Sequence, residues 1–382
     1  MSLLPSARTN AKEKDPCGSD KLYHDGEFHR NVGHLRTNLA FSAASIAAVL
    51  ISSAVLFGYL STAPSANTLR LGFFPNITHA QALFGIATGT FQRAFGSDFA
   101  IQTMVFNAGP TAIQALLTNN VDLIFVGPSP TLSGLAVAGP DVLRVIAGAA
   151  SGGASFVIQP YLDLSTNASF GGKKFATPQF GNTQDIALKH YLLTRGHKTL
   201  DQLGGDVDVI NAANPIILSL FKLRQVDGAW VPEPWATRLV LEANGRVLLD
   251  ERTLWPSGNF VTTHLVTTKR YLEAHRNILT KFLSSYVNVT LQLQRADASN
   301  LTVVNREITN LTGSQLSDET ITRAFSNLSV TYDPIGPSLA TYLTWAQDLG
   351  FIKLGITAAS LYDLTLLNAI LTARGLPPVV GL

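Results

Sequence analysis

The segment of residues 37–60 constrains this chain most, because it contains no charged residue. A helix needs about 20 apolar residues to cross the hydrocarbon core of a bilayer, so the segment is long enough to span a membrane. Arg30 and Arg36 lie just before it, and basic residues beside a span favour the cytoplasmic side. The sequence therefore predicts a single-pass protein of the cell membrane, with a cytoplasmic tail over 1–36, a transmembrane signal-anchor over 37–60 and an extracytoplasmic binding domain.

Cleavage of this segment is an alternative that the sequence leaves open. Small residues at 62–66 are of the type that a signal peptidase accepts. The apolar run is longer than the roughly 7–15 residues of a signal-peptide core, and no cysteine follows it for a lipid anchor. We therefore expect a retained anchor, and a buried core helix is the remaining interpretation of the run.

Length, charge and cysteine content restrict the classes of protein that remain. A chain of 382 residues is long enough for an anchor and two lobes, each with its own core. A formal net charge of +2 with 14% charged residues provides no basic field, so no nucleic-acid partner is expected. The single cysteine, Cys17, precedes the apolar segment, so the rest folds without a disulfide or a thiolate metal site.

Strand-like and helix-like patterns alternate after a linker over 61–68, and this alternation predicts an α/β fold. We expect Asn76 to cap a helix through Phe91, and Asn182 to cap one through Leu192. A strand at 260–267 is expected to return to the first lobe. The other predicted strands are 69–74, 101–106, 121–126, 143–147, 174–176, 207–210 and 227–231, and the predicted late helices are 271–294, 339–349 and 359–372.

Two apolar segments share one pattern and indicate two similar lobes. Residues 121–126 and 226–231 each follow an apolar helix, and each runs into a loop that contains prolines. If they are equivalent strands, lobe 1 comprises 69–155 and 260–382, and lobe 2 comprises 156–259. A chance match of a short β pattern is the alternative.

The loops after the predicted strands hold the candidate ligand contacts. Ligands of open α/β sheets bind beyond the carboxyl ends of the strands, where helix amino termini present unpaired N–H groups. These loops combine polar side chains with glycine or proline, which lets backbone amides converge on an oxyanion. Asn76, Ser129 and Asn182 are each expected either to touch ligand or only to cap a helix. His79 is a further candidate, with a solvated helix residue as its alternative.

Four regions of the chain give it a resemblance to a known family. They are the runs 71–80, 121–122 with 127–128, 178–183 and 230–236. In this order and spacing they resemble the ABC-transporter solute-binding proteins for aliphatic sulfonates, taurine and nitrate. The resemblance implies a two-lobed periplasmic-binding-protein fold of type II with two crossover segments and no cofactor. It also implies a small anionic ligand, and permease and ATPase subunits as partners.

The resemblance further implies roles for individual residues. Ala154 and Ser155 would lie on the hinge side of the cleft. Glu233 and Trp235 would form its far wall, where Glu233 would bind the amine of a taurine-like zwitterion or pair with an arginine such as Arg238. The implied contacts to the anion are Asn76, Thr78, Gly127, Pro128 and Ser129 from lobe 1, and Asn182 and Thr183 from lobe 2.

An enzyme of the same fold, related to thiamine-pyrimidine metabolism, and a sensor ectodomain are the alternatives to transport. The chain contains no Gly-x-Ser-x-Gly, no His-Glu-x-x-His and no cysteine after Cys17, so we expect no catalytic residue and no metal site. A tail over 1–36 is too short for a kinase or a DNA-binding domain. No Gly-x-x-x-x-Gly-Lys-Ser/Thr occurs, so the chain is not itself the ATPase.

Overall fold

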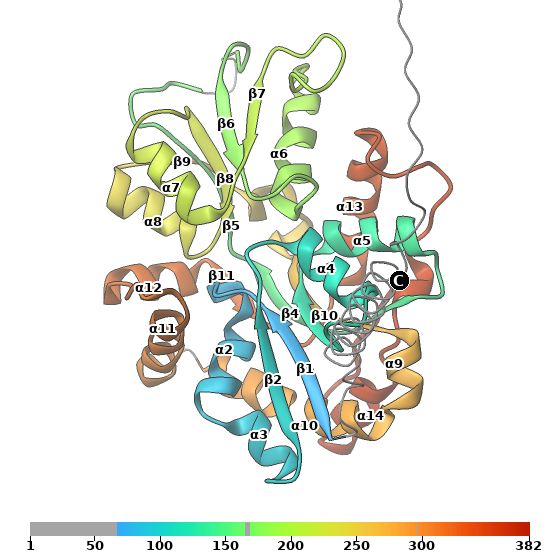
Figure 1. Ribbon diagram of the computed structural model, residues 1–382. Coiled ribbons are helices and arrows are strands. Elements are labelled where there is room, and N and C mark those ends of the chain that lie inside the picture. Colours follow the sequence, from blue (N-terminus) through green and yellow to red (C-terminus); the bar gives the residue numbers. More distant parts are fainter. Residues whose placement is uncertain (1–66, 165–168, 296) are drawn as a thin grey trace, which may run out of the picture. The chain divides into compact units, whose positions relative to one another are not determined.

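The structure is a computed structural model that describes residues 67–164, 169–295 and 297–382. In this part the chain forms two mixed β-sheets, each flanked by helices (Figure 1). No helix of the described part is long and apolar enough to cross a membrane. The predicted tail at 1–36, the anchor at 37–60 and nearly all of the linker at 61–68 lie outside the described residues.

The larger sheet contains β1 (Thr68–Phe73), β2 (Ala100–Val105), β3 (Leu123–Val126), β4 (Leu143–Gly152), β10 (Val261–Thr268) and β11 (Leu328–Val330). Its order is β11-β4-β10-β3-β1-β2. β1 pairs in parallel with β2 and β3, whereas β10 runs antiparallel between β3 and β4. The four strands predicted before residue 150 and the returning strand at 260–267 are confirmed, with shifted ends.

Helices cover both faces of this sheet. They are α2 (Ala80–Ala87), α3 (Thr90–Phe95), α10 (Arg276–Leu293) and α14 (Thr365–Ala373) on one face, and α4 (Gly109–Leu117), α5 (Pro128–Ala138) and α13 (Gly336–Asp348) on the other. Leu123 and Phe125 of β3 pack into the first core, and Ile124 and Val126 into the second. A strand that is covered on both faces needs a continuous apolar run, which explains the sequence pattern at this position.

The smaller sheet contains β5 (Ala154–Ile158), β6 (Lys174–Thr177), β7 (Asp208–Asn211), β8 (Gly228–Pro232) and β9 (Arg246–Asp250). Its order is β7-β6-β8-β5-β9, and α6 (Thr183–Thr194), α7 (Asn214–Lys222) and α8 (Trp235–Ala243) flank it (Figure 1). Trp230 of β8 is buried in the core with α6, whereas Val231 packs with α7 and α8 on the opposite face.

The two sheets repeat one arrangement of four strands. In the larger sheet β1 lies between its parallel neighbours β2 and β3, and β10 follows antiparallel beyond β3. In the smaller sheet β6 lies between its parallel neighbours β7 and β8, and β5 follows antiparallel beyond β8. β3 and β8 therefore occupy the same place, which confirms the predicted equivalence of 121–126 and 226–231.

The chain crosses between the two sheets twice. The first crossing, between β4 and β5, is at Gly153, and the second runs through η2 (Glu251–Leu254) and η3 (Pro256–Gly258) between β9 and β10. Gly152 and Gly153 have φ values of 75° and 73°, which glycine adopts without steric cost. The predicted limits of the two lobes stay predictions.

The helical predictions fail where the backbone leaves the helical conformation. The helix predicted through Phe91 is interrupted at Gly89, whose φ is 67°, so α2 and α3 are separate. The helix predicted at 271–294 is broken at His275 into α9 (Lys269–Ala274) and α10. The elements that were not predicted include α11 (Ala298–Thr312), α12 (Asp318–Ser326) and β11.

Candidate functional site

A small cavity, here called the inner cavity, lies where loops from both sheets meet. Its volume is about 20 Å³, which is room for about one water-sized group. The larger sheet and its loops contribute Phe74, Asn76, Thr78, His79, Asn107, Gly127, Thr262 and Thr263. The smaller sheet and its loops contribute Asn182, Thr183, Gln184, Asn214 and Pro232.

Strand topology brings these residues together, because the carboxyl ends of parallel strands share an edge. Asn76 follows β1, Asn107 follows β2 and Gly127 follows β3. In the smaller sheet Asn182 follows β6 and Asn214 follows β7. Gly127 and Asn182 are the N-caps of α5 and α6, and Asn214 is the first residue of α7. The partial positive charge of three helix amino termini therefore lies at this edge.

No charged side chain lines the inner cavity within the described part of the chain. Its polar groups are amides, hydroxyls and one imidazole, which donate hydrogen bonds without carrying a charge. In the same part of the chain no cluster of three or more His, Cys, Asp or Glu side chains could hold a metal ion. The lining therefore offers uncharged donors to a ligand that accepts hydrogen bonds, as the oxygens of a strong-acid oxyanion do.

His79 offers a neutral hydrogen-bond donor to this space. The backbone N–H of Phe74 donates to Nδ1 of His79 at 3.3 Å, and the two rings stack with 4.5 Å between their centroids. Because Nδ1 accepts, the proton of the neutral imidazole sits on Nε2. Burial lowers the pKa of His79 to about 3, so the ring carries no charge at neutral pH.

Two buried polar atoms of the inner cavity have no hydrogen-bond partner among the residues that the structure describes. They are Oγ1 of Thr183 and Oδ1 of Asn214. A buried polar atom without a partner costs roughly 1–3 kcal/mol, so native proteins rarely retain one without a reason. The Thr183 hydroxyl can donate to an anion, and the Asn214 amide can donate after a 180° rotation that exchanges its oxygen and nitrogen.

Loops from the two sheets approach each other closely around the inner cavity. A Cβ atom on Gly127 would lie 2.3 Å from Oγ1 of Thr183, so glycine is needed for this approach. Nearby, Nε1 of Trp235 donates to Oδ1 of Asn76 at 3.0 Å. Asn76 and Asn182 lie at the N-cap positions of η1 (Ile77–His79) and α6, as predicted, but neither side chain makes a capping hydrogen bond. The Asn76 oxygen is used by Trp235 instead.

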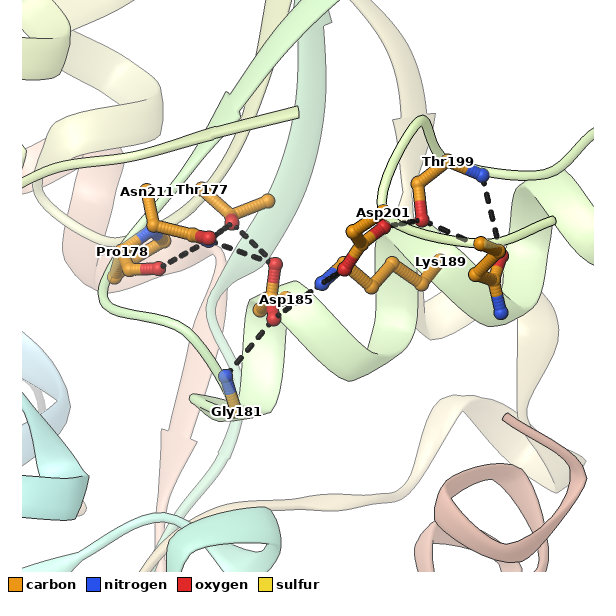
Figure 2. A network of polar contacts seen from close by, with 9 residues as sticks. Thr177, Pro178, Gly181, Asp185, Lys189, Thr199, Asp201 and Asn211 are labelled. Carbon is orange, nitrogen blue, oxygen red and sulfur yellow. Dashed lines mark hydrogen bonds and ion pairs between the residues drawn. The ribbon is translucent and has the colours of Figure 1, made fainter. Parts of the chain in front are cut away.

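Asp185 anchors the loop between β6 and α6 (Figure 2). Asn182 of this loop lines the inner cavity, together with Thr183 and Gln184 of α6. The Asp185 carboxylate accepts hydrogen bonds from Oγ1 of Thr177 at 2.8 Å, N of Gly181 at 2.9 Å and Nδ2 of Asn211 at 2.8 Å. Nζ of Lys189 lies 3.2 Å from the same carboxylate, and both side chains are buried. A buried ion pair with satisfied hydrogen bonds therefore fixes the geometry of this loop.

The structure brings part of the predicted contact set together. The predicted contacts that line the inner cavity are Asn76, Thr78, His79, Gly127, Asn182 and Thr183. Trp235 lines an adjoining larger cavity. The predicted contacts that line neither are Pro128, Ser129, Ala154, Ser155 and Glu233. A ligand contact by any of these residues stays a prediction.

Glu233 is satisfied within the protein. Its carboxylate accepts hydrogen bonds from N and Oγ1 of Thr237, both at 3.0 Å, and from Nδ2 of Asn327 at 2.7 Å. Burial raises the pKa of Glu233, and these hydrogen bonds oppose the shift. The suggested pairing with Arg238 is wrong, because Arg238 pairs with Glu242.

Sequence reasoning missed several polar residues of the inner cavity. Asn107 and Asn214 obey the strand-end rule that selected Asn76 and Asn182, so the sequence contained a usable signal for them. Thr262 and Thr263 lie near the start of β10, an antiparallel strand whose beginning lies beside the end of β3. Only the tertiary pairing places these threonines at the site.

Comparisons with known proteins agree with this architecture. The sequence matches the model of the NMT1-like family over residues 62–304. The taurine-binding periplasmic protein of Escherichia coli is 24% identical over 203 residues, which are 53% of this chain and 59% of that protein. The chain thus matches less than two thirds of the length of that curated relative.

Two solved structures show the same fold at low sequence identity. The alkanesulfonate-binding protein SsuA from Xanthomonas axonopodis pv. citri, bound to MOPS, has a TM-score of 0.60 and 18% identity over 76% of this chain and 94% of its own. The periplasmic nitrate-binding protein NrtA from Synechocystis has a TM-score of 0.67 and 15% identity over 83% of this chain and 91% of its own. The predicted α/β periplasmic-binding-protein fold is thereby confirmed for the described residues.

Proposed function

Because the chain belongs to the NMT1-like family, we propose that it is the extracytoplasmic solute-binding component of an ABC importer and captures a small oxyanion between its two lobes. The predicted resemblance to the solute-binding proteins for sulfonates, nitrate and taurine is confirmed. The choice of ligand within that set, the partner subunits and the membrane anchor at 37–60 are part of the proposal.

The neutral, donor-rich inner cavity supports this function most directly. Thr183 and Asn214 keep buried polar atoms that have no partner among the described residues, and His79 adds an N–H that carries no charge. One helix terminus contributes about 0.3–2 kcal/mol toward an anion, so several convergent donors supply an affinity that no single group reaches. Since no carboxylate lines it in the described part of the chain, the cavity favours nitrate or a simple sulfonate over the ammonium end of taurine.

Ligand binding and lobe closure are coupled in the proposed mechanism. The anion bridges donors from both sheets and so stabilises the closed form by its higher affinity for that form. Two contacts between the sheets support this coupling: Gly127 lies against Thr183, and Asn76 accepts the hydrogen bond from Trp235. The closed form then docks on the permease, and an ATPase subunit drives release.

A screen of ligands by thermal shift and calorimetry tests the function. Nitrate, methanesulfonate, taurine and bicarbonate are titrated into the purified protein, with chloride as the control anion. We expect one-to-one binding of nitrate or methanesulfonate, and weaker binding of taurine. Flat titrations with every oxyanion would contradict the proposal. Binding of a thiamine-type pyrimidine in their place would favour the alternative of a same-fold enzyme or sensor.

A further inference from the structure

A second cavity adjoins the inner cavity, and we call it the outer cavity. Its volume is about 520 Å³, against about 20 Å³ for the inner cavity. The outer cavity lies in the range of about 300–1,000 Å³ that is typical of organic ligands. The inner one has room for about one water-sized group, so an oxyanion head group enters it only as the loops around it move apart. Phe74, Asn76, Asn107 and Asn214 line both cavities, so one molecule can extend from the inner into the outer space.

The walls of the outer cavity are mainly apolar and come from both halves of the fold. Phe106 follows β2, Leu218 belongs to α7, and Ile308 and Leu311 belong to α11. Trp235 contributes its indole, which is tied to Asn76 by the hydrogen bond at 3.0 Å. Such walls suit an apolar body, because burying apolar surface stabilises a complex.

The outer cavity also carries an excess of positive charge. Lys222 and Arg238 are the charged residues in its described lining. Both share one carboxylate, that of Glu242, so two cations face a single anion. The Arg238 guanidinium stacks on Trp235 at 4.6 Å from the ring centroid, and its side chain is only 15% exposed. It is therefore held in place at the wall of the cavity and not free in solvent.

We propose that the outer cavity is a second subsite, which binds the apolar body of an organic oxyanion and a second acidic group at its far end. This inference rests on the proposed function, because the first acidic group occupies the inner cavity. The indole of Trp235 separates the two charged ends, with Asn76 on one side and Arg238 on the other. The preferred ligand is then a dianion with a flat apolar centre, such as an aromatic sulfonate that also carries a carboxylate.

Three ligands of increasing size test the subsite by calorimetry. Methanesulfonate supplies the acidic head group alone, benzenesulfonate adds the apolar body, and 4-sulfobenzoate adds the second acidic group. We expect benzenesulfonate to bind about tenfold more tightly than methanesulfonate, since its phenyl ring is transferred from water into the apolar outer cavity. We expect 4-sulfobenzoate to bind about threefold more tightly than benzenesulfonate, because Arg238 already pairs with Glu242 and an ion pair near the surface contributes modestly.

Variants of Arg238 and Glu242 test whether positive charge at the outer cavity increases the affinity for the second acidic group. Arg238→Met is expected to abolish the threefold preference for 4-sulfobenzoate over benzenesulfonate, and Arg238→Lys to retain it. Glu242→Gln removes the competing carboxylate, so the preference is expected to rise further. If the pair only stabilised the fold, Arg238→Met and Glu242→Gln would change this preference in the same direction. Arg276→Met, at an exposed position on α10, is the control for net charge and is expected to leave the preference unchanged.

The results that would contradict the proposed subsite differ from those that would contradict the proposed function. If methanesulfonate or nitrate binds but the ring and the carboxylate add no affinity, the subsite is wrong and the function stands. A lower preference for 4-sulfobenzoate in Glu242→Gln also contradicts the subsite. If no oxyanion binds the wild-type protein, both proposals fail.

Discussion

Trp235 donates its indole N–H to the side-chain oxygen of Asn76, a residue 159 positions earlier in the chain. Asn76 follows β1 of the larger sheet, and Trp235 is the first residue of α8, which follows β8 of the smaller sheet. The bond therefore joins equivalent edges of the two repeated halves. It lies between the inner cavity, which Asn76 lines, and the outer cavity, which both residues line.

Trp235→Phe removes this hydrogen bond and keeps an aromatic ring in the wall. We expect the affinity for the best oxyanion to fall about two- to tenfold, because a neutral hydrogen bond contributes about 0.5–1.5 kcal/mol to the closed form. Calorimetry measures the affinity, and thermal unfolding of the ligand-free protein shows whether the fold is intact. An unchanged affinity would mean that the closed form does not depend on this contact.

Asp185→Asn tests whether the buried ion pair positions the anion-binding loop. The substitution leaves the buried Lys189 with Asp201, at 3.3 Å, as its one ionic partner among the described residues, so we expect a loss of about 3 kcal/mol in the free energy of unfolding. The affinity for the oxyanion is expected to fall about tenfold as the hydrogen bond to Gly181 weakens. Denaturant unfolding and calorimetry measure the two effects.

The double variant Asp185→Asn with Lys189→Met separates the two roles of the pair. Replacing both charges removes the uncompensated ammonium, so most of the stability is expected to return. The ligand affinity is expected to stay low, because the loop has lost its charged anchor. Recovery of stability and affinity together would show that the pair stabilises the fold without positioning the site.

The affinity for a strong-acid oxyanion is expected to be nearly independent of pH between 5 and 8. Burial holds the pKa values of His79 and His264 at about 3, so both rings are neutral throughout this range. Nitrate titrations at pH 5, 6.5 and 8 are expected to differ by less than about twofold. An affinity that rises as the pH falls through 6.5 would reveal a histidinium at the site.

Glu251 makes the stability of the fold depend on pH. Burial raises the pKa of the Glu251 carboxyl from 4.5 to about 7, although Tyr342 and Trp230 donate hydrogen bonds to it. The folded protein therefore binds this proton more tightly than the unfolded chain does. The resulting stability is fully present below pH 4.5 and is lost as the pH rises to about 7.

Glu251→Gln is expected to remove this loss, because the amide stays neutral. From pH 5 to pH 8 the variant should gain up to about 3 kcal/mol in the free energy of unfolding relative to the wild-type protein. Comparing the two proteins at each pH cancels the contributions of the histidines, which both share. Glu273→Gln, at an exposed position, is the control. Parallel pH curves for Glu251→Gln and the wild type would refute the shifted pKa.

The sequence was most informative where one segment determines its own structure. The run of β3 is apolar on both faces, so this strand could be predicted within two residues, and its match at 226–231 indicated two halves. It was least informative where partners are distant in sequence. The oxygen of Asn76 was expected to cap a helix, and nothing local could show that Trp235 would take it. Glu233 likewise resembles a ligand contact until Asn327 is placed beside it.

The central claim is that hydrogen-bond donors from both sheets bind one anion. A matched pair of variants tests this claim most directly. Thr78→Val and Thr183→Val each remove one buried hydroxyl of the inner cavity at nearly constant volume, the first beside the larger sheet and the second beside the smaller. Thr344→Val, at an exposed position on α13, is the control. Calorimetric titration with the tightest-binding oxyanion is predicted to show about a fivefold or greater loss of affinity for each cavity variant, and none for the control. Full affinity in either cavity variant would mean that one half alone holds the ligand, and would contradict the account.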